Sequence, residues 1–174
     1  DEEPLELLTA SPEGGHLVGG PAVAGDLVLV GSSDGNLYAF STDISGGSGA
    51  LSEAWNFRTG NKVWSTPAVT DTLAYFGSLD HHLYAVSLLD GSLAWDFMAG
   101  GGITATPIIH QGRVYIGAFD SIFYSLDAAS GTELARFEGA GSWYWGTPAI
   151  GENAIYVPSL DGQTYALDLR TLEP

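Results

Sequence analysis

Apolar residues alternate with small or polar residues in short runs along the whole chain, and this alternation is typical of half-buried β-strands. The runs come in pairs separated by a turn that contains an aspartate, as in LVLVGS-SDG-NLYAFS. A brief apolar run after a proline precedes each pair. A fourth run follows the first three pairs as EAWNF, LAWDF and LARFE. No segment shows the apolar spacing of an amphipathic helix. We therefore predict an all-β fold.

The runs belong to an internal repeat, whose period shows the architecture. Four segments beginning at residues 19, 65, 105 and 146 align without gaps, and three markers recur with spacings of 46, 40 and 41 residues. A unit of four antiparallel strands repeated at about 40 residues is typical of a β-propeller blade. Six extra residues in the first unit fall in the Gly- and Ser-rich stretch 41–53, which we predict to be a surface loop. The markers are Pro21, Pro67, Pro107 and Pro148; Asp34, Asp80, Asp120 and Asp161; and Tyr38, Tyr84, Tyr124 and Tyr165.

The four recurring aspartates are predicted to form turns. Asp-Gly in the first and fourth hairpins supplies the positive φ angles of a tight turn. A catalytic carboxylate should occur once, whereas Asp34, Asp80, Asp120 and Asp161 occupy the same position in every repeat. We therefore assign them a structural role.

The two ends of the chain point to a displaced strand. The last repeat ends at Pro174 without a fourth run, and residues 5–9 precede the first proline by the offset of a fourth strand. We expect one domain of four blades, at about 20–60, 61–101, 102–141 and 142–174. We expect strand 5–9 to close the last blade of this chain or of a second copy, because an unpaired sheet edge is a liability. The chain could also be part of a longer propeller.

The repeats resemble the PQQ-like, or quinoprotein-type, β-propeller family. The resemblance rests on TPAV at 66–69, YFGSLDHHLYAV at 75–86, DGSLAW at 90–95, YIGAFDSIFYSLDAASG at 115–131 and VGSSDGNLYAF at 30–40. The family includes quinoprotein dehydrogenases, BamB-like periplasmic scaffold proteins and sensor domains, usually with seven or eight blades. It implies a docking tryptophan on the fourth strand, which Trp55 and Trp95 match. In the third repeat we place Arg136 at that position. Pro158 replaces a glycine that the other three repeats share.

The composition of the chain argues against several classes of function. Lys and Arg number 5 and Asp and Glu number 21, a formal net charge of −16. Such a surface repels phosphate, so we expect no nucleic-acid partner. The absence of cysteine excludes thiolate zinc sites and cysteine nucleophiles. No apolar run is long enough to span a membrane. High-salt adaptation, a cationic partner and simple solubility remain alternative explanations of the acidity.

The remaining choice is between a binding module and an enzyme. A PQQ-dependent dehydrogenase needs calcium ligands that converge from several blades, and the acidic residues lie mostly in turns or near the termini. We expect neither a cofactor nor a catalytic residue, with a dehydrogenase fragment as the alternative. The adjacent His81 and His82 point apart and show no third ligand, so we expect no metal site.

Aromatic residues supply the candidate binding surface. Trp64 and Trp145 each stand three residues before a repeat proline, at the mouth of the propeller axis. They could plug the axis or anchor a ligand. The run Trp143-Tyr144-Trp145 cannot point one way in an extended backbone, so at least one ring should be exposed. We therefore predict a non-enzymatic binding or scaffold module for a protein or small ligand.

Two further expectations concern the location of the protein and its oligomeric state. The lack of cysteine and the family resemblance favour a periplasmic or secreted location. A homodimer could form an eight-bladed ring, because two-fold symmetry is the commonest closed arrangement.

Overall fold

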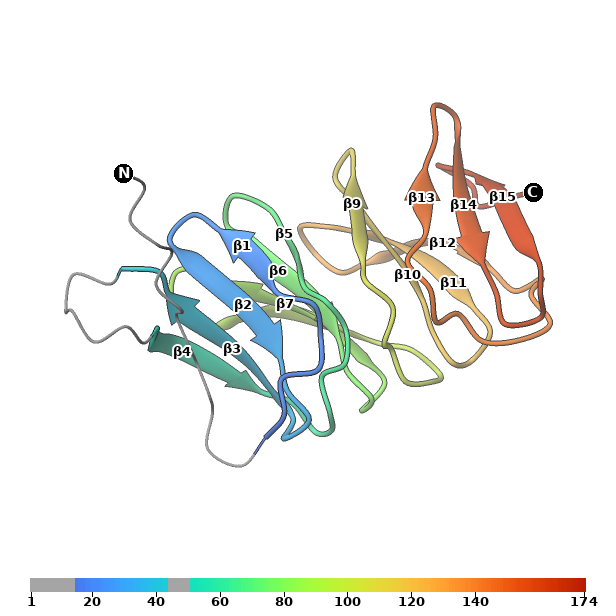
Figure 1. Cartoon of the computed structure of the whole chain (residues 1–174). Helices are drawn as coiled ribbons and strands as arrows, with labels where there is room; N and C mark the ends of the chain where they lie inside the picture. The colour runs from blue at the N-terminus through green and yellow to red at the C-terminus, as the bar shows by residue number, and fades with distance from the viewer. Residues whose placement is uncertain (1–14, 44–50) are drawn as a thin grey trace, which may run out of the picture.

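The structure is a computed structural model that describes residues 15–43 and 51–174. These residues form fifteen strands in four antiparallel sheets, which lie side by side (Figure 1). The predicted all-β fold of propeller blades is thereby confirmed. Within the described residues, no helix could cross a membrane. The strands are β1 (Ala22–Ala24), β2 (Leu27–Gly31), β3 (Asn36–Ser41), β4 (Ser52–Arg58), β5 (Ala68–Val69), β6 (Leu73–Gly77), β7 (His82–Ser87), β8 (Leu93–Met98), β9 (Ile108–His110), β10 (Arg113–Gly117), β11 (Phe123–Asp127), β12 (Glu133–Phe137), β13 (Ala149–Ile150), β14 (Ala154–Pro158) and β15 (Thr164–Asp168).

Each sheet follows the chain, so that every strand pairs with the next one in sequence. The first three blades, β1–β4, β5–β8 and β9–β12, have four strands, and the last blade, β13–β15, has three. The pairing of the third with the fourth strand shifts at the same place in all three complete blades, for example between Ala85 and Val86. The repeat seen in the sequence is therefore also a repeat of backbone geometry.

The hydrophobic core lies between blades. Because both faces of the two middle strands carry apolar side chains, the second and third blades each pack one face on the preceding blade and the other on the following blade. Tyr75 and Trp95 of the second blade, for example, share a buried cluster with Val114 and Ile116 of the third. The first joint buries Leu29, Leu37, Ala39, Trp55, Val63, Ala74, Phe76 and Val86, and the third buries Tyr115, Phe123, Tyr144, Ile155, Val157, Leu167 and Leu172.

A glycine at the end of the second strand allows this close approach. A Cβ at Gly77 would lie 2.1 Å from Cγ2 of Ile103 in the next blade, and one at Gly117 would lie 2.2 Å from Cβ of Tyr144. Pro158 takes this position in the last blade, where no following sheet exists within the described residues. A proline fits there because it ends its strand and meets no neighbouring blade.

The structure corrects one expectation at the third joint. Trp55 pairs with Ala39 and Trp95 with Ala85, and the equivalent Ser125 pairs with Ala135. Arg136 instead pairs with Tyr124, and its guanidinium binds Glu133 at 2.6 and 2.7 Å. The prediction that Arg136 stands in the tryptophan position was wrong by one residue, because matching LARFE to LAWDF shifts the third repeat by one position. Ala135 follows Tyr124 by 11 residues, as Trp95 follows Tyr84, and the two strands pair in the same register.

The described sheets form an open row, with the first blade at one end and the last blade at the other (Figure 1). The predicted closing strand at 5–9 and part of the predicted loop, 44–50, lie outside the described residues. In the described part of the chain, β15 pairs only with β14. Tyr156 on the outer face of this last sheet is 47% exposed.

Candidate binding surface

The run from Trp143 to Trp145 is held extended between two neighbouring turns. The backbone N–H of Tyr144 donates to the carbonyl of Ala118 at 3.3 Å, and that of Leu160 donates to the carbonyl of Trp143 at 3.0 Å. Successive side chains then point to opposite sides. Tyr144 is 1% exposed and packs in the third joint, whereas Trp143 and Trp145 are 49% and 50% exposed. At least one exposed ring was expected in this run, and two are exposed, whereas Tyr144 of the predicted surface is buried.

The two exposed indoles are positioned by Phe119, from the turn between β10 and β11. Its ring stacks with Trp143 at a centroid distance of 5.0 Å and with Trp145 at 5.4 Å. The interplanar angles are 21° and 15°, so all three rings are nearly parallel. Near-parallel stacking across two blades restrains the rings while leaving about half of each indole exposed.

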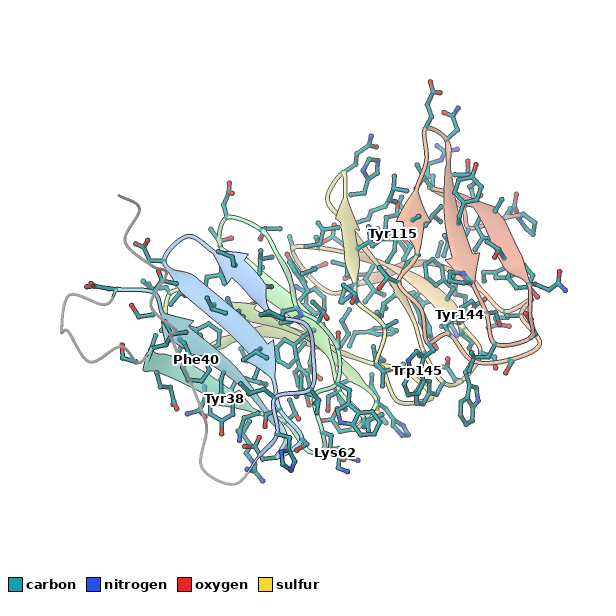
Figure 2. All side chains as sticks on the ribbon, viewed as in Figure 1. Tyr38, Phe40, Lys62, Tyr115, Tyr144 and Trp145 are labelled. Carbon is teal, nitrogen blue, oxygen red and sulfur yellow. The ribbon has the colours of Figure 1, made fainter. Side chains whose placement is uncertain are left out.

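A second aromatic group lies at the equivalent place in the second blade. Trp64 is 37% exposed, and the Lys62 ammonium lies 5.4 Å from the centroid of its ring. Figure 2 shows Lys62 and Trp145 on the same side of the molecule, where the turns between second and third strands lie. We call Trp64, Phe119, Trp143 and Trp145 the aromatic surface.

Small residues in the third blade connect the two halves of this surface. Gly102 and Thr104 take the positions of the large pairs Lys62–Trp64 and Trp143–Trp145. A Cβ at Gly102 would lie 3.0 Å from Leu79 and 3.5 Å from Phe119, so that these two side chains flank the glycine. Thr104 is buried, and its hydroxyl has no hydrogen-bond partner within the described residues.

The four recurring aspartates lie in the turns that carry this side of the molecule. The Asp120 carboxylate accepts hydrogen bonds from the backbone N–H of Gly100 and Ile122 and from the hydroxyl of Tyr124, at 2.8, 2.9 and 2.6 Å. Asp80 and Asp161 accept the equivalent three bonds. Each of these carboxylates thus joins its turn to the segment that enters the blade.

Hydrogen bonding also sets the protonation of these carboxyls. The hydroxyl of Tyr165 lowers the pKa of Asp161 below its usual value. For Asp34, burial raises the pKa, but hydrogen bonds from Asn36 and Tyr38 outweigh it and leave the pKa lowered. Both groups are held as anions at neutral pH, which suits turn acceptors.

The predicted docking tryptophans lie between blades. The indole Nε1 of Trp55 donates to the carbonyl of Leu88 at 3.0 Å, and that of Trp95 donates to the carbonyl of Ala128 at 3.0 Å. At the third joint, where Ala135 replaces the indole, the hydroxyl of Tyr115 donates to the equivalent carbonyl of Leu169 at 2.6 Å. Tyr115 is the counterpart of Tyr75, which donates to the carbonyl of Ala128 at 3.0 Å, so the third joint keeps the tyrosine bond and lacks the indole bond.

The histidine pair takes part in local contacts. His81 has a φ of 78° in its turn, and Nδ1 of His82 lies 2.8 Å from Oδ2 of Asp96. Across residues 15–43 and 51–174, no three His, Asp or Glu side chains gather as a metal site would require.

The sequence singled out Trp64, Trp143, Tyr144 and Trp145, and the structure turns three of them outward. Phe119 and Lys62 were not singled out from the sequence. Phe119 could have been noticed because it takes the position before the turn aspartate that Leu79 and Leu160 hold in the second and fourth repeats.

Comparisons with known proteins agree with this architecture. The structure of BamB from Moraxella catarrhalis is 18% identical with a TM-score of 0.74, covering 94% of this chain and 49% of BamB. The computationally designed Ika8 protein is 19% identical with a TM-score of 0.76, covering 88% of this chain and 46% of its own. The computationally designed Ika4 protein is 17% identical with a TM-score of 0.79, covering 95% and 99%. At these identities the likeness concerns the fold. The chain spans about half the length of BamB and of Ika8.

No curated protein sequence matches the chain. The family model described as outer membrane protein assembly factor BamB matches residues 6–117, which is more than half of the chain. The chain therefore belongs to the BamB family of PQQ-like β-propeller proteins.

Proposed function

We propose that this chain is a non-enzymatic scaffold that binds a partner protein outside the cytoplasm. Membership of the BamB family supports an interaction role on a rigid repeat fold. The recurring aspartates, which a catalytic proposal would need, are instead engaged in turn hydrogen bonds, as at Asp120 and Asp161. A rigid set of turns is a suitable platform for a binding surface.

One observation carries the proposal: Trp143 and Trp145 are stacked on Phe119 and remain half exposed. Tryptophan is among the commonest anchors of protein interfaces, because it buries a large area at a small cost in side-chain entropy. Stacking on Phe119 reduces that cost further by fixing the rings before a partner arrives. The geometry thus supports binding better than a passive plug of the axis.

The test compares two variants in partner capture. The chain carrying W143A and W145A, and a matched control carrying Y156A at the open end, are used with wild type to isolate partners by crosslinking. Each partner is then purified and titrated against all three proteins. We expect a partner that binds wild type and Y156A but loses at least tenfold in affinity for W143A/W145A. Equal binding to all three would overturn the proposed site.

The extracytoplasmic location has a separate test. Cells that produce the natural protein are fractionated, and the chain is followed with an antibody. Recovery with periplasmic or secreted markers is expected, and recovery with cytoplasmic markers alone would contradict the proposed location.

A second copy of the chain is the partner that we propose for ring formation. The four blades follow half of BamB with a TM-score of 0.74, so their curvature is that of a ring about twice as large. Two copies related by a two-fold axis would close such a ring at two equivalent seams. Light scattering over a concentration series should give twice 18.2 kDa. A mass of 18.2 kDa at every concentration would overturn the dimeric ring while leaving the aromatic surface intact.

A further inference from the structure

The exposed indoles present electron-rich faces that suit a cation. A cation over an aromatic ring within about 6 Å is attracted by the ring quadrupole, most strongly for tryptophan. Lys62 already makes this contact with Trp64 at 5.4 Å. Within the described residues, Trp143 and Trp145 have Phe119 as their ring partner and no cation over them. These two indoles therefore have the chemistry for a cation that the chain itself does not supply.

The charge of the chain favours the same ligand. Acidic residues outnumber basic ones by 21 to 5, and Lys62 is the single lysine. Two turn carboxylates lie next to residues in contact with this surface: Asp120 directly follows Phe119, and Asp161 directly follows Leu160, whose N–H donates to the carbonyl of Trp143 at 3.0 Å. Such a field raises the encounter rate of a cationic partner and disfavours an anionic one.

The spacing of the indoles indicates the shape of the ligand. Trp143 and Trp145 are two residues apart in an extended backbone, with Tyr144 turned inward. In an extended peptide, alternate side chains also share one face, with a rise of roughly 3.3 Å per residue. Basic side chains at alternate positions of such a peptide would thus have the same backbone spacing as Trp143 and Trp145.

We infer that the aromatic surface binds an extended basic segment of a partner protein, whose arginines stack on Trp143 and Trp145. Arginine fits better than lysine because its planar, weakly hydrated guanidinium stacks on an aromatic face. The inference rests on the proposed function and names the chemistry of the partner at the same surface. The adjacent carboxylates supply long-range attraction, and the rings supply the specific contact.

The experiment is isothermal titration calorimetry with synthetic peptides on the whole chain. The probe is a ten-residue peptide of alternating arginine and serine. Two matched peptides replace every arginine with lysine or with glutamine. We expect the arginine peptide to bind, the lysine peptide to bind several-fold more weakly and the glutamine peptide not to bind. Affinity for the arginine peptide should fall as salt is raised.

Variants then separate the rings from general electrostatics. W143A/W145A should lose at least tenfold in affinity for the arginine peptide, whereas W143F/W145F, which keeps ring faces, should lose less. The control L89A, at an exposed residue in the turn between β7 and β8, should bind as wild type does. Circular dichroism and thermal unfolding establish that each variant is folded, which is expected because the replaced rings are half exposed.

The results that would contradict the inference can be told apart from those that would contradict the proposed scaffold function. Equal affinity of the alanine pair and wild type would show attraction by charge alone and overturn the inference. Binding of the glutamine peptide, or of neutral maltohexaose in place of the arginine peptide, would also overturn it. If no peptide binds but a captured partner depends on Trp143 and Trp145, the arginine chemistry fails and the proposed scaffold function stands.

Discussion

The indole Nε1 of Trp95 donates to the carbonyl of Ala128 at 3.0 Å, and this bond ties the second blade to the third. The same carbonyl also accepts from the hydroxyl of Tyr75 at 3.0 Å. The indole lies over Gly131, where a Cβ would approach to 2.5 Å. A bulky ring, a glycine and a shared acceptor therefore form one packing unit between blades.

Two substitutions of Trp95 distinguish the stability contributed by its packing from that contributed by its hydrogen bond to Ala128. We expect Trp95→Ala to lower the free energy of unfolding by about 3–5 kcal/mol, because it empties a large buried site. Trp95→Phe should cost less, since part of the ring remains and Tyr75 still satisfies the carbonyl; the lost bond alone is worth about 1 kcal/mol. Chemical denaturation measures both. The exposed Trp143→Ala is the control, and a loss as large as that of Trp95→Ala would contradict this account.

The glycine at the blade joint should tolerate no side chain. In Gly77→Ala the new Cβ would meet Ile103 at 2.1 Å, and the joint would have to open. We expect a loss of about 1–3 kcal/mol from overpacking. The matched control is Pro158→Ala, at the same blade position without a following sheet in the described structure. Its cost should not exceed about 1 kcal/mol, mainly through the freer unfolded chain. If the denaturation midpoint fell by the same amount in both variants, the result would contradict the close packing of Gly77 at the blade joint.

The turn carboxylates should make stability depend on acidity. The pKa of Asp161 in the folded chain lies below the ordinary 3.8, because Tyr165 donates to the carboxylate. Asp161 therefore contributes stability that is fully present above pH 3.8 and is lost as the pH falls through its folded pKa. Asp161→Asn should unfold at a lower temperature than wild type at neutral pH. That difference should shrink below pH 3.8. Thermal melts across this range provide the measurement, and a constant difference would argue against the role of this carboxylate.

A quinone assay addresses the proposed absence of enzymatic activity. The chain is incubated with PQQ and calcium, and absorbance and dye reduction are followed with simple alcohols and glucose. We expect no change above a protein-free control, because the described carboxylates that recur in the blades are engaged in their turns. Substrate-dependent dye reduction would replace the scaffold proposal with a dehydrogenase.

Much of this architecture could be predicted from sequence because its causes are local. Alternating apolar residues favour the strands, Asp and Gly favour the turns, and the repeat of three markers separates the blades. Trp64 and Trp145 could also be singled out, since each stands three residues before a repeat proline, and Trp143 because it extends the same aromatic run. The alternation of an extended backbone predicted that at least one ring of the run 143–145 is exposed, but not that Tyr144 is the buried one.

Other features depended on contacts between distant residues. The hydrogen bond from the Tyr115 hydroxyl to the carbonyl of Leu169 joins residues that are 54 positions apart. The stacking of Phe119 with two indoles joins a turn of the third blade to the entry of the fourth. The strands, the turns and the number of repeats depend on residues that are close in the chain, so the pattern of amino acids is enough to predict them. Which rings meet and which remain exposed depends on how successive blades pack, so these contacts emerge only in the folded molecule.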